Sequence, residues 1–156
     1  MVDTSHDDGF TLVEAMVVIA LIGVLAAIAI SGWSAWAKAS AHSGTAREIQ
    51  AVLQQAQQRA VAEGQALCVW FDTAADTYTV HRGTCASRAG VVSGPHSTAS
   101  PAVEIASADF GSPSSPGVTM QPRGTADAGS VLVTRSDSAK QYQLTVERLT
   151  GRVTLT

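Results

Sequence analysis

Glu14 is the residue of this chain whose chemistry first needs an explanation. It stands near the start of an apolar run, residues 10–30. This run is long enough to cross a bilayer, because a hydrocarbon core about 30 Å thick needs roughly 20 helical residues. A charged side chain at the centre of a spanning helix costs about 2.5 to 3.5 kcal/mol, and less toward the interface. Glu14 is therefore expected to have a cationic partner.

The residues around Glu14 carry a specific pattern. The segment Gly-Phe-Thr-Leu-Val-Glu, from Gly9 to Glu14, resembles the cleavage and assembly signature of type IV prepilins and pseudopilins. The resemblance implies that a prepilin peptidase cuts after Gly9, that the new N-terminus on Phe10 is methylated, and that Glu14 becomes the fifth mature residue. It also implies the missing partner: the Glu14 carboxylate of one subunit pairs with the Phe10 α-amine of a neighbour inside an apolar bundle.

Two other interpretations of this region stay open. Glu14 is also compatible with an interfacial acid on a plain membrane anchor, since it lies only about 7 Å into the helix at 1.5 Å per residue. An ordinary secretory signal has a shorter apolar region, about 7 to 15 residues, behind a basic segment. The leader, residues 1–9, holds three aspartates and neither Lys nor Arg. Leaders of the prepilin family are usually basic. Because this one has no basic residue, the positive-inside rule gives no orientation for the span.

The length and charge of the chain restrict its function classes. The 156 residues include 10 basic and 13 acidic side chains, for a formal net charge of −3. Removal of residues 1–9 takes away three of the acids and leaves a balance of 10 and 10. A neutral mature chain predicts no large electrostatic field for nucleic acid. About 90 residues follow the first helix, which is enough for one small core.

The apolar run is expected to continue into a longer helix. No proline interrupts residues 10–63, so we expect one helix that ends before Gly64, a C-terminal glycine stop. Residues 10–30 form the transmembrane or filament-core segment, and residues 31–63 its amphipathic continuation. One face of this continuation has helical spacing and is formed by Ile49, Val52, Leu53, Ala56 and Ala60. Trp33 and Trp36 either mark the membrane interface or pack helices in a filament.

Residues 64–156 change to short runs of β-branched and aromatic residues, which predict a β-rich globular headpiece. Residues 86–101 and 111–116 are rich in Ser, Gly, Ala and Pro and are expected to be loops. The fold class is therefore α+β and type IV pilin-like: a long N-terminal helix, transmembrane in its first half, packs on a small antiparallel β-sheet headpiece. The expected strands are residues 66–71, 77–81, 103–106, 118–121, 131–134, 142–148 and 152–156.

Cys68 and Cys85 lie beyond the membrane run, on the side that the resemblance places in the periplasm or outside the cell. Disulfides persist there. A bridge between them would close a short loop and stabilise the fold by about 3 kcal/mol in the chain-entropy model. Two buried free thiols are the alternative, because the spacing alone is not a strong motif.

Catalytic and metal-binding patterns are not found in the sequence. The four histidines are scattered, and there is neither a nucleophile elbow nor a phosphate-binding glycine loop. Asp72 and Asp76 bracket a short turn and are expected to be turn residues rather than calcium ligands. We expect no enzyme, no metal and no cofactor.

The second half of the chain sharpens the resemblance. Residues 45–65, 121–134 and 142–156 resemble the helix end, the glycine turn and the terminal Gly-Arg hairpin of GspH/FimT-type minor pilins. In some FimT-like pilins that hairpin contributes to DNA capture, with a second arginine where this chain has Thr154. Arg152 and Arg148 are therefore candidate DNA contacts. A basic patch with Arg88, Arg123 and Arg135 and a set of solvated strand-edge arginines are both open interpretations.

The resemblance implies that the function is assembly. A minor pilin of this type is a single-pass inner-membrane protein with a periplasmic or extracellular headpiece. It then primes or caps a type IV pilus, and DNA uptake is an additional candidate role. Its implied partners are other pilin or pseudopilin subunits, the prepilin peptidase, the inner-membrane assembly platform and membrane lipid. The alternatives are a pseudopilin of a type II secretion system and a tip DNA receptor for natural transformation.

Overall fold

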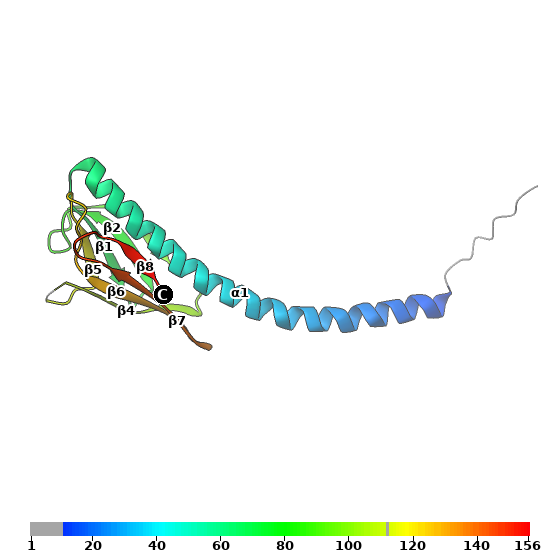
Figure 1. Cartoon of the computed structure of the whole chain (residues 1–156). Helices are drawn as coiled ribbons and strands as arrows, with labels where there is room; N and C mark the ends of the chain where they lie inside the picture. Colours follow the sequence, from blue (N-terminus) through cyan, green and yellow to red (C-terminus); the bar gives the residue numbers. More distant parts are fainter. Residues whose placement is uncertain (1–10, 112) are drawn as a thin grey trace, which may run out of the picture. The chain divides into compact units, whose positions relative to one another are not determined.

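The computed structural model of the chain describes residues 11–111 and 113–156. Over these residues one helix is followed by eight strands (Figure 1). Gly9 and Phe10, the expected cleavage and methylation residues, lie outside the described residues. The elements are α1 (Leu12–Glu63), β1 (Leu67–Asp72), β2 (Thr77–Arg82), β3 (Gly90–Ser97), β4 (Val103–Phe110), β5 (Gly117–Met120), β6 (Gly129–Arg135), β7 (Ser138–Val146) and β8 (Val153–Leu155).

The helix α1 is continuous over 52 residues, as the absence of proline predicts. Its C-terminal end is closed by Gly64, which has a φ of 65°, and by a hydrogen bond from the Gln65 N–H to the Ala60 carbonyl at 3.2 Å. This is the 6→1 pattern of a Schellman cap, which favours glycine in the left-handed conformation. The chain forms two compact units that divide within α1, one that ends at Ala37 and one from Lys38 to Thr156.

The unit from Lys38 to Thr156 contains two antiparallel sheets of four strands each. Sheet A has the order β3-β2-β1-β5, and sheet B has the order β4-β6-β7-β8. The second part of α1 buries its apolar face against both sheets, and the fully buried side chains include Ile49, Leu53, Leu67, Val69, Phe71, Tyr78, Ile105, Phe110, Met120 and Leu144. The predicted long helix on an antiparallel headpiece is confirmed, and the headpiece has two sheets rather than one.

Sheets A and B are joined by specific polar contacts as well as by the shared core. The Asp76 carboxylate, in the turn between β1 and β2, accepts a hydrogen bond from the Ile105 N–H of β4 at 2.8 Å. Asp76 has a φ of 52°, a conformation that Asp and Asn tolerate better than most residues. On the helix side, the buried ring of His42 makes a 3.1 Å hydrogen bond with the Val133 carbonyl of β6. These contacts hold one helix and two sheets as a single headpiece.

The strand β3 corrects the expectation that residues 86–101 form a loop. Gly90–Ser97 pairs with β2, placing Tyr78 opposite His96 and His81 opposite Val91, with irregular register between them. Five of its eight residues are exposed and none is buried, in keeping with a sequence that has no long apolar run. Pairing with β2 creates this strand, and pairing is a tertiary effect that composition does not reveal. The strands β4 and β7 are also longer than expected, while β8 is shorter.

Candidate functional site

The first turn of α1 positions Glu14. The Thr11 hydroxyl accepts a hydrogen bond from the Glu14 N–H at 3.2 Å, and the Thr11 carbonyl accepts one from the Ala15 N–H at 3.1 Å. Thr11 is therefore the N-cap of the helix, and Glu14 occupies the third helical position, as in a capping box. An acid at a helix N-terminus also interacts favourably with the helix dipole. The Thr-x-x-Glu spacing is the sequence signal for this local role, which was not among the expectations for Glu14.

The first part of α1 presents an exposed apolar surface. By length and composition α1 can cross a membrane, and none of its most apolar stretch is buried within the described residues. Leu12 is 76% exposed, Leu25 66% and Ile28 67%. Burial of apolar side chains gains about 25 cal/mol per Å², so this surface is strongly driven into lipid or against other helices.

Two tryptophans follow the apolar segment. Trp33 and Trp36 are both exposed, and their ring centroids lie 5.4 Å apart in a tilted arrangement. Aromatic pairs at this separation attract each other beyond the area that they bury. The pair forms an amphipathic aromatic patch on α1, which is suited to a membrane interface as well as to a neighbouring helix.

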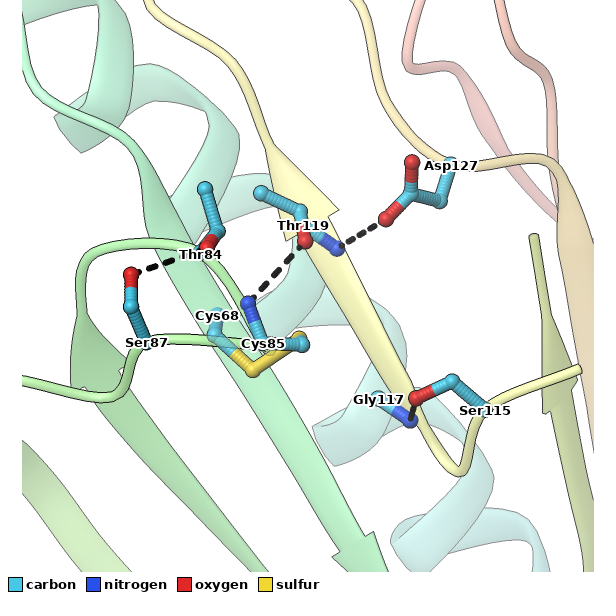
Figure 2. Close-up of a disulfide and its surroundings, with 8 residues drawn as sticks. All are labelled: Cys68, Thr84, Cys85, Ser87, Ser115, Gly117, Thr119 and Asp127. Atoms are coloured by element: carbon cyan, nitrogen blue, oxygen red, sulfur yellow. Dashed lines mark hydrogen bonds between the residues drawn. A yellow bond between two sulfur atoms is a disulfide. The ribbon is translucent and has the colours of Figure 1, made fainter. Parts of the chain in front are cut away.

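The predicted disulfide between Cys68 and Cys85 is present (Figure 2). It ties the central strand β1 to the loop that follows β2, and the Cα atoms lie 5.0 Å apart. The Cys85 N–H donates to the Thr119 hydroxyl of β5 at 3.2 Å, and the Thr119 N–H donates to the Asp127 carboxylate at 3.1 Å. The loop is thus held across β1 and β5.

Gly117 of β5 leaves the space that this loop needs. A Cβ atom at Gly117 would lie 2.7 Å from the Trp70 ring and 2.8 Å from the Cys85 sulfur. On the same side, the guanidinium of Arg88 stacks 3.9 Å from the centroid of the Trp70 ring. Burial, together with the nearby Arg88 charge, lowers the pKa of His81. The loop of residues 83–89 is therefore a fixed cover on sheet A.

The structure separates the five arginines that sequence analysis considered as one patch. Arg88 lies on Trp70 of sheet A, and Arg135 pairs with Asp137, which also pairs with Lys38 of α1 at 3.3 Å. Arg135 is at the end of β6 opposite the hairpin that carries Arg148 and Arg152, about 25 Å away at 3.3 Å per residue along the strand. A single five-arginine surface is not formed.

Arg123, Arg148 and Arg152 lie on two turns that touch near Gly151, although Arg148 and Arg152 line different surfaces. The Ala126 N–H donates to the Arg148 carbonyl at 3.0 Å. A Cβ atom at Gly151 would lie 2.7 Å from the Gly124 carbonyl, so the turn that holds Arg123 touches the hairpin that holds Arg148 and Arg152. Arg123, Arg148 and Arg152 are exposed, while Asp127 and Glu147 place two acids nearby. The local positive excess is small.

The remaining carboxylates of interest have structural roles. The Asp72 carboxylate accepts hydrogen bonds from the N–H groups of Ala74 and Ala75 at 3.0 and 3.1 Å, the geometry of an Asx-turn. The Tyr78 hydroxyl donates to the Glu48 carboxylate of α1 at 2.7 Å. Burial, reinforced by Glu48, raises the pKa of Tyr78 well above its usual value. Within residues 11–111 and 113–156, no group of three or more His, Cys, Asp or Glu side chains could hold a metal ion.

A groove runs between α1 and the edge strand β8. It has a volume of about 590 Å³, and its walls include the amides of Gln50, Gln54 and Gln57 and the side chain of Arg152. Gln57 donates hydrogen bonds to the Thr150 and Gly124 carbonyls at 2.7 and 3.1 Å. Gln50 makes a longer contact, 3.4 Å, with the Val153 carbonyl. This row of glutamines was not among the expected site residues, because polar residues on a helix normally face solvent.

The comparisons with known proteins agree with this architecture. Residues 4–30 match the prokaryotic N-terminal methylation motif, and residues 45–150 match the family described as type II transport protein GspH. No curated protein matches the chain significantly.

Two solved structures share the fold. The type IV minor pilin FimU of Pseudomonas aeruginosa PAO1 aligns with a TM-score of 0.59 and 16% identity, covering 73% of this chain and 87% of that one. The minor pseudopilin EpsH from the Type 2 Secretion System of Vibrio cholerae aligns with a TM-score of 0.55 and 16% identity, covering 73% and 94%.

Proposed function

Because the chain belongs to the GspH family of type II transport proteins, we propose that it is a minor subunit that primes or caps a type IV pilus. The family and the N-terminal methylation motif both support a membrane-anchored pilin or pseudopilin subunit. Such subunits are structural proteins rather than enzymes. The observation that carries the proposal is the exposed apolar surface of α1, with Glu14 in its first turn.

The proposed mechanism uses two forces of different kind. The apolar surface that begins at Leu12 anchors the subunit in the inner membrane, with the headpiece on the periplasmic side, and then packs against other subunits. This packing supplies most of the assembly energy, because the free energy of apolar burial grows with the buried area and the apolar segment is long. Glu14 supplies alignment. Its carboxylate would meet the Phe10 α-amine of a neighbour, which cleavage after Gly9 by the prepilin peptidase exposes, and the inner-membrane assembly platform would bring the two together.

The substitution Glu14→Gln tests the charge without removing the cap. Glutamine serves as well as glutamate in a capping box, so the helix start formed by Thr11 is expected to persist. The full-length variant should remain in the membrane fraction at the wild-type level, while its amount in sheared filaments should fall by at least about tenfold, the equivalent of one lost charge-assisted contact.

Asp8→Asn is the matched control. It also replaces one carboxylate by an amide, but in the leader, so cleavage after Gly9 would give an unchanged mature chain. This control should enter filaments normally. Wild-type incorporation of Glu14→Gln, or mature protein that retains residues 1–9, would refute the assembly mechanism.

A type II secretion pseudopilin is the alternative within the same class of protein. It uses the same helix and the same first turn, so the two assignments differ in the apparatus served rather than in chemistry. Deletion of this gene should abolish surface filaments while leaving the export of secreted enzymes intact. The reverse result, lost export with normal filaments, would assign the subunit to a pseudopilus.

DNA binding is a second candidate function, supported by the position of Arg123, Arg148 and Arg152 on two touching turns at one end of the headpiece. Phosphate contacts by Lys and Arg make DNA binding strongly salt-dependent. If this end binds DNA, Arg152→Ala should weaken binding of a random-sequence duplex to the full chain in detergent and reduce the salt slope by about 1. Arg88→Ala, in the loop over Trp70 of sheet A, should leave the binding unchanged. Absence of a gel shift at low salt would exclude this function.

A further inference from the structure

The strand β8 is an edge strand of sheet B, and it lines a groove beside α1. Gln143 of β7 and Thr156 exchange two backbone hydrogen bonds at 3.0 and 2.9 Å, and the Glu147 N–H donates to the Arg152 carbonyl at 3.0 Å. In an antiparallel pair, backbone groups alternate in direction, so Val153 and Leu155 direct theirs away from β7. Because β8 is the last strand of sheet B, the Leu155 groups and the Val153 N–H form an edge that another strand can pair with, while the Val153 carbonyl accepts a hydrogen bond from Gln50.

The opposite wall of this groove carries amide side chains at regular intervals, and that of Gln57 already donates to the Thr150 and Gly124 carbonyls at 2.7 and 3.1 Å. Gln50, Gln54 and Gln57 occupy positions i, i+4 and i+7 of α1, so they share one helix face and form a row along β8. Gln50 already touches the Val153 carbonyl, at the long distance of 3.4 Å. A contact of this length is weak, so a better-placed backbone N–H can replace it. The groove, about 590 Å³, is within the usual size range of binding clefts.

The charge of the groove restricts its occupant. Among the described residues that line it, Arg152 is the one charged side chain, and the others are amides, hydroxyl groups and the aliphatic residues of β8. Amides and a free strand edge recognise a peptide backbone, whereas the arginine recognises a carboxylate. A nucleic-acid groove would present several cations along its length. The lining therefore favours an extended peptide with an acidic side chain.

We propose that the groove between α1 and β8 binds an extended, acid-containing segment from the headpiece of a neighbouring subunit, which adds a strand to sheet B beside β8. Backbone pairing with Val153 and Leu155 supplies affinity, and Arg152 selects an Asp or Glu of the partner. The inference rests on the proposed function, since it takes the partner to be another subunit of the same filament. It assigns the headpiece a contact distinct from the packing of α1.

A photo-reactive residue tests the proposal in the full chain. p-Benzoylphenylalanine replaces Gln54, which is exposed in the groove, and the protein is expressed with its complete filament system and irradiated in cells. Mass spectrometry of the adduct should identify a headpiece segment of another subunit, with an Asp or Glu within a few residues. The same replacement at Thr73, in the turn between β1 and β2, is the control and should not capture that segment.

Two pairs of variants separate the expected contacts from general damage. Leu155→Pro removes an outward N–H, whereas Leu155→Ala removes more packing but keeps the N–H. Arg152→Glu reverses the charge in the groove, whereas Arg148→Glu reverses a charge on the same hairpin that lines other surfaces. Leu155→Pro and Arg152→Glu should lower the adduct yield by about fivefold or more, the equivalent of one hydrogen bond, while their partners keep it near wild type.

The possible outcomes distinguish the inference from the proposed function. If the protein enters filaments but the photo-reactive residue at position 54 gives no adduct, the inference fails and the proposed function stands. An adduct with a partner helix or with nucleic acid, or equal losses in Arg152→Glu and Arg148→Glu, also overturns it. Absence of the protein from filaments contradicts the proposed function itself. Wild-type thermal midpoints for the Arg152→Glu and Arg148→Glu variants would verify that both are folded.

Discussion

At the scale of the single residue, several positions have more than one role. The sequence predicted a cationic partner for the Glu14 carboxylate. The structure adds that the Glu14 backbone N–H completes the helix cap made by Thr11. Asp76 and Tyr78 looked like ordinary turn and strand residues in the sequence. Asp76 joins sheets A and B, and Tyr78 joins β2 to Glu48 of α1. Such roles depend on residues distant in sequence, so composition and spacing could not predict them.

Gly129 gives a sharp test of packing between β4 and β6. A Cβ atom there would lie 2.0 Å from the Asp109 carbonyl oxygen and 2.7 Å from Phe110, so Gly129→Ala forces the backbone apart. The free energy of unfolding should fall by about 1 to 3 kcal/mol. Gly90→Ala, where a Cβ atom meets nothing within 4 Å, should change it by less than about 0.5 kcal/mol. Denaturant unfolding of both full-length variants in detergent would measure the difference.

Tyr78 predicts a dependence of stability on alkaline pH. Its pKa is raised in the folded protein, chiefly by burial and then by Glu48, so unfolding allows the phenol to ionise near its ordinary value of 10. Stability contributed by the neutral phenol is complete below pH 10 and is lost as the pH rises further. The loss approaches about 1.4 kcal/mol per pH unit.

Unfolding curves at pH 9, 10 and 11 would measure this slope. Tyr78→Phe should be less stable than wild type at pH 8, because it removes the hydrogen bond to Glu48, but its stability should fall less steeply above pH 10. Identical slopes for the two proteins would contradict the assignment.

At the scale of elements, the sequence predicted the helix and most strands, but not the division into two sheets. The absence of proline and the Gly64 stop were sufficient for α1, because helix boundaries follow from local chemistry. The strands rich in β-branched and aromatic residues were also recognisable. The strand β3 was not, since its Ser, Gly and Pro residues form a strand only by pairing with β2. The groove beside β8 likewise arises only when α1 and the C-terminal hairpin meet.

The disulfide predicts a large effect of reduction on the headpiece. The bridge joins residues 17 positions apart, and a loop of this size contributes about 3 kcal/mol in the chain-entropy model. Unfolding in the presence of a reductant should therefore lower the stability of the wild type by about that amount. The double variant Cys68→Ala, Cys85→Ala should start from the lower value and show no response to the reductant. A wild-type stability that the reductant leaves unchanged would contradict this role of the bridge.

At the scale of the whole molecule, the chain combines two units with different solvent requirements. The exposed apolar side chains of α1 concentrate before residue 30, whereas the core residues lie in the unit from Lys38 to Thr156. The two family matches follow a similar division: the methylation motif covers residues 4–30, and the GspH domain covers residues 45–150. The helix α1 therefore runs through both units, the exposed apolar segment and the headpiece.

This division predicts that residues 38–156 fold without the apolar segment. Their core, both sheets and the disulfide are contained within that range. The fragment should be monomeric in detergent-free buffer, unfold cooperatively and give the circular dichroism of a β-rich protein. The full chain should require detergent under the same conditions. A fragment that aggregates or lacks cooperative unfolding would show that the headpiece depends on the first part of α1.

The contacts between the glutamine row and the C-terminal hairpin have a consequence for biosynthesis. Gln50 meets Val153, a partner 103 residues later in the chain. Ribosomes add about 5 to 20 residues per second, so Val153 is synthesised about 5 to 20 s after Gln50. During that interval the apolar face of α1 that includes Ile49 and Leu53 is not yet covered by the last strands, so the headpiece can close only after the C-terminal hairpin has been made.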